Sequence, residues 1–189
     1  RHGGFRFSAH DSEHTLLNGA ENRTGPYGTA TSWSVTKSNP QYLWQQLSAN
    51  PEFRLRVADH IQKHFFNNGA LTPTAARNRF AVRTNQIYSA VVAESARWGD
   101  SKVATPFNRD QHWLPRVNDI MANYMGQRTA NVLTQLRARN LYTTTVAPAF
   151  SQHGGNVVGG FRLAITAPAG EIRYTLDGSD PREIGGAVA

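Results

Sequence analysis

The sequence contains no cysteine among its 189 residues. Structural disulfides, cysteine-ligated zinc and a thiol nucleophile are therefore excluded. No apolar run approaches the roughly 20 residues that cross a bilayer, which excludes a membrane-spanning helix. Glycine and proline, at 16 and 9 residues, are too few for a collagen-like or low-complexity chain. These absences leave a globular chain that is long enough to bury a core.

Charged residues are also scarce, at 17% of the chain against about 25% in an average domain. The formal net charge of +7 arises from 20 basic and 13 acidic side chains. It reflects a shortage of acids, because the arginines are scattered and form no concentrated basic stripe. We therefore expect no nucleic-acid partner, since such proteins gather their positive charge on one face.

Two Asn-Pro pairs predict helix starts early in the chain. Asn39-Pro40 and Asn50-Pro51 each place a capping side chain before a proline, which is tolerated at the first helical position. The second helix carries an apolar residue at every fourth position, which predicts a buried face. These residues are Phe53, Val57, Ile61 and Phe65. The Asn67-Asn68-Gly69 segment is expected to end this helix in a left-handed turn.

Three further helices are predicted before residue 141. One opens at Thr72-Pro73, runs to about Trp98 and ends at Gly99-Asp100. Its expected buried face consists of Ala76, Phe80, Ile87 and Val91. A fourth helix is predicted over 114–125, and Gly126 is expected to interrupt the helical pattern after it. A fifth helix is predicted from Val132 to about Asn140.

The composition changes after Tyr142 from helix formers to threonine, proline and glycine. Alternating side chains predict two antiparallel strands, over 161–165 and 171–176, joined through Pro168 and Gly170. Another strand is predicted over 5–10, where aromatic and polar residues alternate. The expected fold is α+β, with a mainly helical lobe of about five helices, entered by a short strand and followed by a small partial antiparallel β module. We place the domains at 1–146 and 147–189.

The densest group of polar side chains lies at the end of the first strand, in His10-Asp11-Ser12-Glu13-His14. Carboxylates at alternate positions of an extended segment point the same way, so Asp11 and Glu13 could share Mg²⁺ or Ca²⁺. The histidines could instead suggest zinc, but no four-ligand spacing supports it. A loop joined by side-chain-to-backbone hydrogen bonds explains the same residues equally well. The residues by themselves leave both interpretations open.

Two other segments have competing interpretations. At the end of the third helix, we expect Arg97 to form an ion pair and Trp98 to be buried. Near the C-terminus, Asp177, Gly178, Asp180 and Pro181 predict a structural turn, because glycine accepts positive φ and aspartate bonds back to the main chain. The alternative for that turn is a calcium loop, which would need six to eight ligands.

The chain resembles the C-terminal part of a CotH-like domain, from the spore-coat protein H family of atypical secretory kinases. The resemblance rests on five ordered motifs: F-R-F-S-A-H-D-S-E-H-T-L (5–16), N-P-Q-Y-L-W-Q-Q-L (39–47), N-P-E-F-R-L-R-V-A-D-H (50–60), G-A-L-T-P (69–73) and E-S-A-R-W-G-D (94–100). Two later stretches, A-P-A-F-S-Q-H-G-G (147–155) and I-R-Y-T-L-D-G-S-D-P-R (172–182), resemble the start of the chitobiase/β-hexosaminidase C-terminal type of β-sandwich.

The resemblance implies ATP-dependent phosphoryl transfer to serine or threonine of a protein partner, with Mg²⁺ or Mn²⁺ and ATP as cofactors. The family's W-D-x-D motif reads H-D-S-E here, so Asp11 corresponds to the first metal ligand and Glu13 to the second acid. The family's phosphate clamp and catalytic base precede this motif. We therefore expect a fragment of the kinase domain, inactive by itself, from a protein that acts outside the cell or at its surface.

A non-catalytic extracellular scaffold that attaches to glycan or protein surfaces is the alternative. The two hypotheses differ at Asp11, which a kinase requires and a scaffold does not.

Overall fold

The structure is a computed structural model that describes residues 12, 15–25 and 40–188. It contains the α-helices α1 (Pro40–Leu47), α2 (Pro51–Phe65), α3 (Pro73–Ile87), α4 (Ala90–Trp98), α5 (Leu114–Asp119) and α6 (Met125–Ala138), the π-helical segments η3 (Arg109–Trp113) and η4 (Ile120–Tyr124), and the strands β1 (Ala149–Phe150) and β2 (Ile165–Thr166). The predicted mainly helical α+β class is confirmed. No helix in these ranges is long and apolar enough to cross a membrane.

The helix starts follow the capping signals of the sequence. The α1 helix begins at Pro40 and α2 at Pro51. The Asn50 side chain accepts a hydrogen bond from the backbone N–H of Phe53, as an N-cap residue does. Asn67 lies in the left-handed region with φ 53° directly after α2, so the predicted left-handed stop is confirmed.

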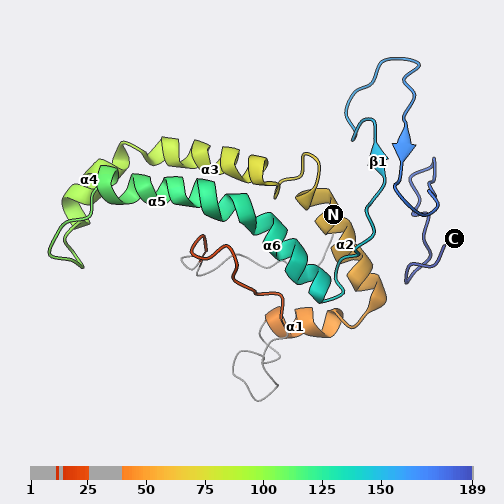
Figure 1. The fold of residues 1–189 in the computed structure, drawn as a ribbon, viewed down its shortest axis with the longest axis horizontal. Helices are drawn as coiled ribbons and strands as arrows, with labels where there is room; N and C mark the ends of the chain where they lie inside the picture. The colour runs from red at the N-terminus through yellow and green to blue at the C-terminus, as the bar shows by residue number, and fades with distance from the viewer. Residues whose placement is uncertain (1–11, 13–14, 26–39, 189) are drawn as a thin grey trace. The chain divides into compact units, whose positions relative to one another are not determined.

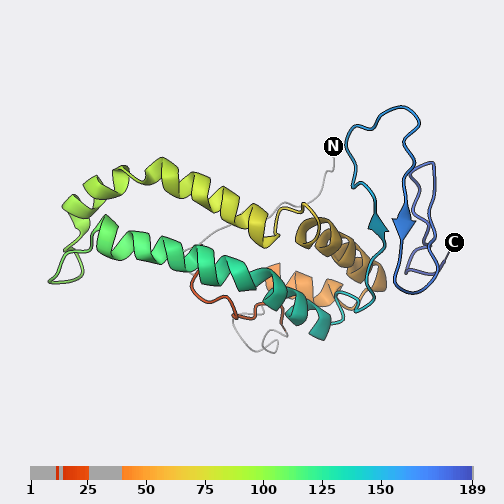
Figure 2. The ribbon, with the colours of Figure 1, turned by 45° about the horizontal axis from the view of Figure 1, so that its top comes forward.

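The chain divides into two compact units, and the divisions fall after residue 21, inside α3 and inside α6. One unit comprises residues 1–21 and 76–128, and the other comprises residues 22–75 and 129–189. Within the first unit, α3 from Ala76 onward and the helix over 109–128 lie side by side (Figures 1 and 2). Val117 and Ile120 are its buried apolar residues in the described ranges.

The second unit has a core around Ile61, which is only 4% exposed. Ile61 packs with Leu136, Leu141 and Tyr142, and the predicted stripe of α2 supplies partly buried neighbours. Val57 and Phe65 are the members of that stripe among the partly buried residues, which are Trp44, Val57, Ala58, Phe65, Phe66, Val132 and Leu133. The four-residue spacing in α2 therefore identifies a face that is packed in this unit.

The prediction of one helix over 73–98 was wrong, because Tyr88 and Ser89 form a turn between α3 and α4. The Tyr88 ring lies 6.1 Å from that of Trp113 and beneath the Arg109 guanidinium, at 4.2 Å. Ile87, expected on the buried face, is 48% exposed, whereas Thr84 is buried. The Thr84 hydroxyl donates to the backbone oxygens of Phe80 or Ala81, so its burial leaves no polar group unpaired.

The predicted break at Gly126 is also wrong, because helical structure continues from Arg109 to Ala138. A Cβ atom at Gly126 would lie 2.9 Å from Nη2 of Arg77. Arg77 instead donates to the backbone oxygen of Met121 at 2.7 Å and approaches that of Ala122 at 3.4 Å. The glycine therefore leaves room for an arginine between two neighbouring helices and does not end the helix.

The β module differs from the prediction in its pairing. Strands β1 and β2 lie side by side (Figure 2) and pair antiparallel. Ala149 lies opposite Thr166, and Phe150 lies opposite Ile165. The expected strand over 171–176 is not formed. The alternation in that segment indicates two faces, but a strand also needs a partner backbone, and residues 171–176 pair with no strand. The proposed domain boundary after residue 146 stays a prediction.

Candidate functional site

The predicted metal ligands Asp11 and Glu13, and the neighbouring His10 and His14, lie outside the described residues. Their joint role therefore stays a prediction. Among the residues that the structure does describe, no three histidine, aspartate or glutamate side chains come together to hold a metal ion.

The segment that follows Glu13 in the chain is anchored by two arginines of the same unit. Arg116 Nη2 donates to the backbone oxygen of Leu16 at 2.7 Å. Arg128 Nη1 donates to the backbone oxygens of Gly19 at 3.1 Å and Glu21 at 2.5 Å. Charge-assisted hydrogen bonds of this kind are stronger than neutral ones, so they hold residues 16–21 against the helix that carries both arginines.

The C-terminal turn forms the side-chain bonds that the structural interpretation expects. Asp177 Oδ1 accepts from the backbone N–H of Ser179 at 3.0 Å and from its hydroxyl at 2.6 Å. Gly178 has φ +80°, a value that a residue with a Cβ rarely adopts. The bonds from Ser179, led by its hydroxyl, lower the pKa of Asp177 below its ordinary value. The choice between a structural turn and a calcium loop stays a prediction.

Asp180, next in the turn, binds Arg182. Its Oδ1 accepts from the backbone N–H of Arg182 at 3.0 Å and from Nε at 2.9 Å, and its Oδ2 accepts from Nη2 at 2.9 Å. The side-chain bond with Arg182 lowers the pKa of Asp180 to about 2. Pro181 lies between the two partners in the chain. Its ring fixes φ and therefore restricts the backbone between Asp180 and Arg182.

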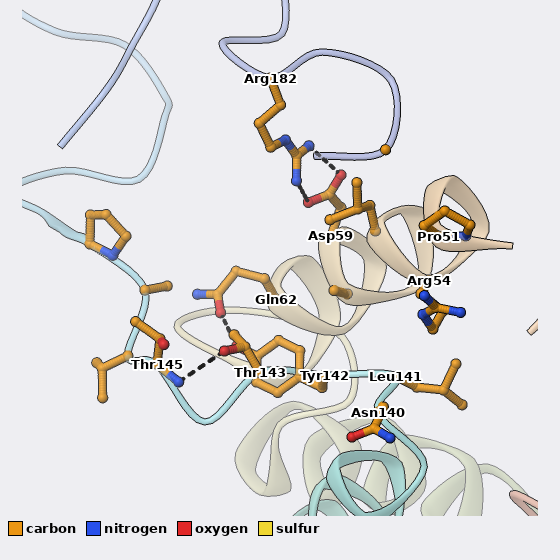
Figure 3. A pocket seen from close by; sticks show the side chains of 16 residues that line it. Pro51, Arg54, Asp59, Gln62, Asn140, Leu141, Tyr142, Thr143, Thr145 and Arg182 are labelled. Carbon is orange, nitrogen blue, oxygen red and sulfur yellow. Dashed lines mark hydrogen bonds and ion pairs between the residues drawn. The ribbon is translucent and has the colours of Figure 1, made fainter. Parts of the chain in front are cut away.

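Arg182 also reaches α2, where it meets Asp59 (Figure 3). The bonds run from Nη1 to Oδ1 at 3.0 Å and from Nη2 to Oδ2 at 2.8 Å. The two carboxylates, Asp180 first, raise the pKa of the guanidinium further above its ordinary value. Sequence reasoning missed this contact, because nothing in the local pattern at Asp59 points to a residue 123 positions away.

These residues line a groove of about 660 Å³ in the second unit, which we call the α2 groove (Figure 3). Its walls are α2, the segment 140–148 that follows α6, and the loop at Arg182 and Gly185. The Tyr142 hydroxyl donates to Oε1 of Gln62 at 2.5 Å, and burial raises the pKa of Tyr142. The backbone N–H of Gly185 donates to Glu52 at 3.1 Å, which holds the loop against α2.

The arginines of the α2 groove already have partners. Arg182 is shared between two carboxylates, and Arg54 Nη1 donates to the backbone oxygens of Ser48 and Ala49 at 3.0 and 2.9 Å. These bonds stabilise the connection after α1 and the docking of the C-terminal loop. The two arginines that line the groove are therefore engaged in structural contacts within the second unit.

No protein-family model, no curated protein and no solved structure matches the chain.

Proposed function

We propose that this chain forms the metal-bearing, mainly helical part of a CotH-like kinase. In the parent protein, that kinase transfers a phosphoryl group from ATP to serine or threonine of a protein partner, outside the cell or at its surface. The observation that carries the proposal is the ordered series of sequence motifs, which starts at Asp11 and Glu13 and ends at Asp100.

The positions of the later motifs support this proposal. The two Asn-Pro motifs lead into α1 and α2, the G-A-L-T-P motif leads into α3 at Pro73, and E-S-A-R-W-G-D closes α4. Each of these motifs therefore includes a helix start or a helix end, where capping and turn residues decide how a helical domain is connected. Two proteins that share a helical framework are expected to share motifs at such positions.

The residue types at the acidic motif fit a hard divalent cation, because Asp11 and Glu13 offer only oxygen ligands. A bound Mg²⁺ or Mn²⁺ would neutralise negative charge on the phosphates of ATP. The chain's own contribution would be to hold that cation and to restrain the segment after it. Arg116 and Arg128 perform the second task for residues 16–21.

Calorimetric titration with Mn²⁺ tests the metal-binding part of the proposal on the full chain. We expect Asp11→Asn and Glu13→Gln each to weaken Mn²⁺ binding by at least about tenfold, because each removes a charged ligand. Asp100→Asn is the matched control and should bind Mn²⁺ like the wild type. Equal affinity in all four proteins would reject a metal site at Asp11 and Glu13.

Transfer of labelled γ-phosphate to protein, measured in the longer parent protein, tests the catalytic part separately. We expect Asp11→Asn to abolish incorporation and Asp100→Asn to leave it unchanged. If Asp11→Asn no longer binds Mn²⁺ but phosphorylation continues, the kinase proposal would be contradicted. The proposal of a metal site at Asp11 would then still hold.

The second candidate function is that of a non-catalytic extracellular scaffold. It is favoured by the apolar side chains that the β module leaves uncovered, among them Leu176 at 94% exposed and Ile184 at 91%. Exposed apolar groups in such number favour association with a partner. A scaffold would keep its binding in Asp11→Asn, which distinguishes it from the kinase.

A further inference from the structure

A second groove, of about 390 Å³, lies within the first unit, between the end of α4 and η3. We call it the aromatic groove, after Trp98, Phe107 and Trp113, which line it together with Glu94, His112 and Arg116. Its volume falls in the range of ligand sites, which are mostly apolar with a few polar groups. Neither proposed function uses it.

The chain builds this groove by closing a loop over 100–106. The backbone N–H of Phe107 donates to the oxygen of Gly99 at 2.9 Å, and that of Gly99 donates to Ser95 at 2.9 Å. A Cβ atom at Gly99 would lie 2.5 Å from the backbone oxygens of both Ser95 and Phe107, so only glycine fits. The closed loop brings Phe107 to the end of α4, where Trp98 lies.

The opposite wall is π-helical. His112 and Trp113 both direct their backbone N–H groups to the oxygen of Asn108, at 3.2 Å each. The π-helical turn places these two successive side chains on the groove. Such turns are rare and often mark functional sites, because they redirect side chains that a regular helix would place elsewhere.

Two aromatic rings in the groove remain accessible. Trp98 is 52% exposed and Phe107 is 51% exposed. The expectation that Trp98 is buried beside an Arg97 ion pair was wrong. The Arg97 guanidinium lies over the Trp98 ring, 5.0 Å from its centroid, and makes no ion pair within the described residues.

The polar groups of the groove include one unpaired acceptor and one unpaired donor. Within the described residues, the Glu94 carboxylate has no hydrogen bond or ion pair. His112 Nδ1 accepts the backbone N–H of Asn108 at 3.1 Å, which places the proton of the neutral ring on Nε2 as a donor. Arg116 is paired with Asp119. Because Asp119 already neutralises Arg116, the Glu94 carboxylate leaves the described residues of the groove with one uncompensated negative charge.

We propose that the aromatic groove binds a pyranose ring of a neutral oligosaccharide. The apolar C–H face of such a ring packs on Trp98, while its hydroxyls donate to Glu94 and accept from His112. The uncompensated Glu94 carboxylate repels anionic ligands, and an apolar peptide would bury this carboxylate unpaired at a cost. A basic peptide is the competing occupant, and titration with hexalysine distinguishes it from the oligosaccharide. This inference is independent of the metal site at Asp11 and of phosphoryl transfer.

Calorimetric titration of the full chain with three probes tests the proposal: cellohexaose, xylohexaose and the hexamer of N-acetylglucosamine. We expect at least one of them to bind with a millimolar or lower dissociation constant. Trp98→Ala should weaken that binding by at least about tenfold, and Trp98→Phe by less, because a ring remains. Glu94→Gln should also weaken it, since the carboxylate is the stronger acceptor.

The matched control is Tyr174→Ala, which removes another exposed aromatic ring, 65% exposed, from the β module. It should bind the same oligosaccharide like the wild type, and circular dichroism should show an unchanged helical content in every variant. The proposal is overturned if none of the three oligosaccharides binds or if Trp98→Ala binds as tightly as the wild type. Trp98-dependent binding of hexalysine without sugar binding would assign the groove to basic peptides instead.

Discussion

Arg182 and Asp59 form a two-point ion pair between the C-terminal loop and the middle of α2, with bonds of 3.0 and 2.8 Å. The planar guanidinium donates two parallel hydrogen bonds to the two carboxylate oxygens, which the ammonium group of lysine cannot do in this geometry. The same arginine also binds Asp180, so one side chain joins the turn over 177–181 to the helical part of the second unit.

Replacing Arg182 by alanine should release the C-terminal loop from α2. Both partners are partly exposed, so the free energy of unfolding should fall by less than about 1 kcal/mol. The clearer effect should be faster cleavage after Ile184 by a protease under native conditions. Arg173→Ala, which removes only a pair with the neighbouring Glu171, is the control and should be cleaved at the wild-type rate. Equal cleavage of all three proteins would show that Arg182 does not hold the loop.

The docking of this loop should depend on pH in the acid range. The pKa of Asp180 is lowered to about 2 from an ordinary value of 3.8, mainly by Arg182. A lowered folded-state pKa stabilises the contact above the ordinary value, and this contribution is lost as the pH falls from about 4 to 2. NMR titration of the Asp180 carboxyl carbon measures the shift. In Arg182→Ala the midpoint should move up towards 3.8, and an unchanged midpoint would contradict the assigned cause.

Asp177 should stabilise its turn without calcium. Asp177→Ala removes the bonds to Ser179 and should lower the melting temperature by the same amount in EDTA and in millimolar Ca²⁺. Ser179→Ala, which removes the hydroxyl bond and keeps the carboxylate, should have a smaller effect. A wild-type melting temperature that rises with Ca²⁺, and does not rise in Asp177→Ala, would favour the calcium loop.

Truncating the core at Ile61 should destabilise the second unit strongly. Ile61→Ala should cost about 2–5 kcal/mol, because it opens a cavity among Leu136, Leu141 and Tyr142. Leu43→Ala is the control in the same unit, and since this side chain is exposed, its cost should stay below about 0.5 kcal/mol. Urea denaturation measures both, and similar midpoints would mean that the α2 face is not packed.

Adding a methyl group at Gly99 should disturb the closed loop before η3. Gly99→Ala places a Cβ against two backbone oxygens and should cost about 1–3 kcal/mol. Gly159→Ala is the matched control, because nothing lies within 4 Å of its added Cβ. Thermal unfolding compares the two. A Gly99→Ala variant as stable as the control would show that the loop accommodates the methyl group.

The features that the sequence determined by itself are local. Two of them are hydrogen bonds between residues at most three positions apart: the Asn50 cap and the bonds from Ser179 to Asp177. The third is the left-handed backbone of Asn67. Over such short distances the chain geometry leaves few alternatives. The four-residue spacing around Ile61 likewise identified a packed face, because helical periodicity alone places those side chains together. The metal role of Asp11 and Glu13 stays a prediction from sequence.

Tertiary structure decided which distant groups meet. The alternation over 171–176 indicates two faces but cannot select a partner strand, and in the structure β2 pairs with β1 whereas residues 171–176 form no strand. A glycine such as Gly126 often marks a helix end, yet here its lack of a side chain leaves room for Arg77 to bond to the backbone oxygen of Met121. The pair between Arg182 and Asp59 depends in the same way on the packing of segments far apart in the chain, which no local pattern encodes.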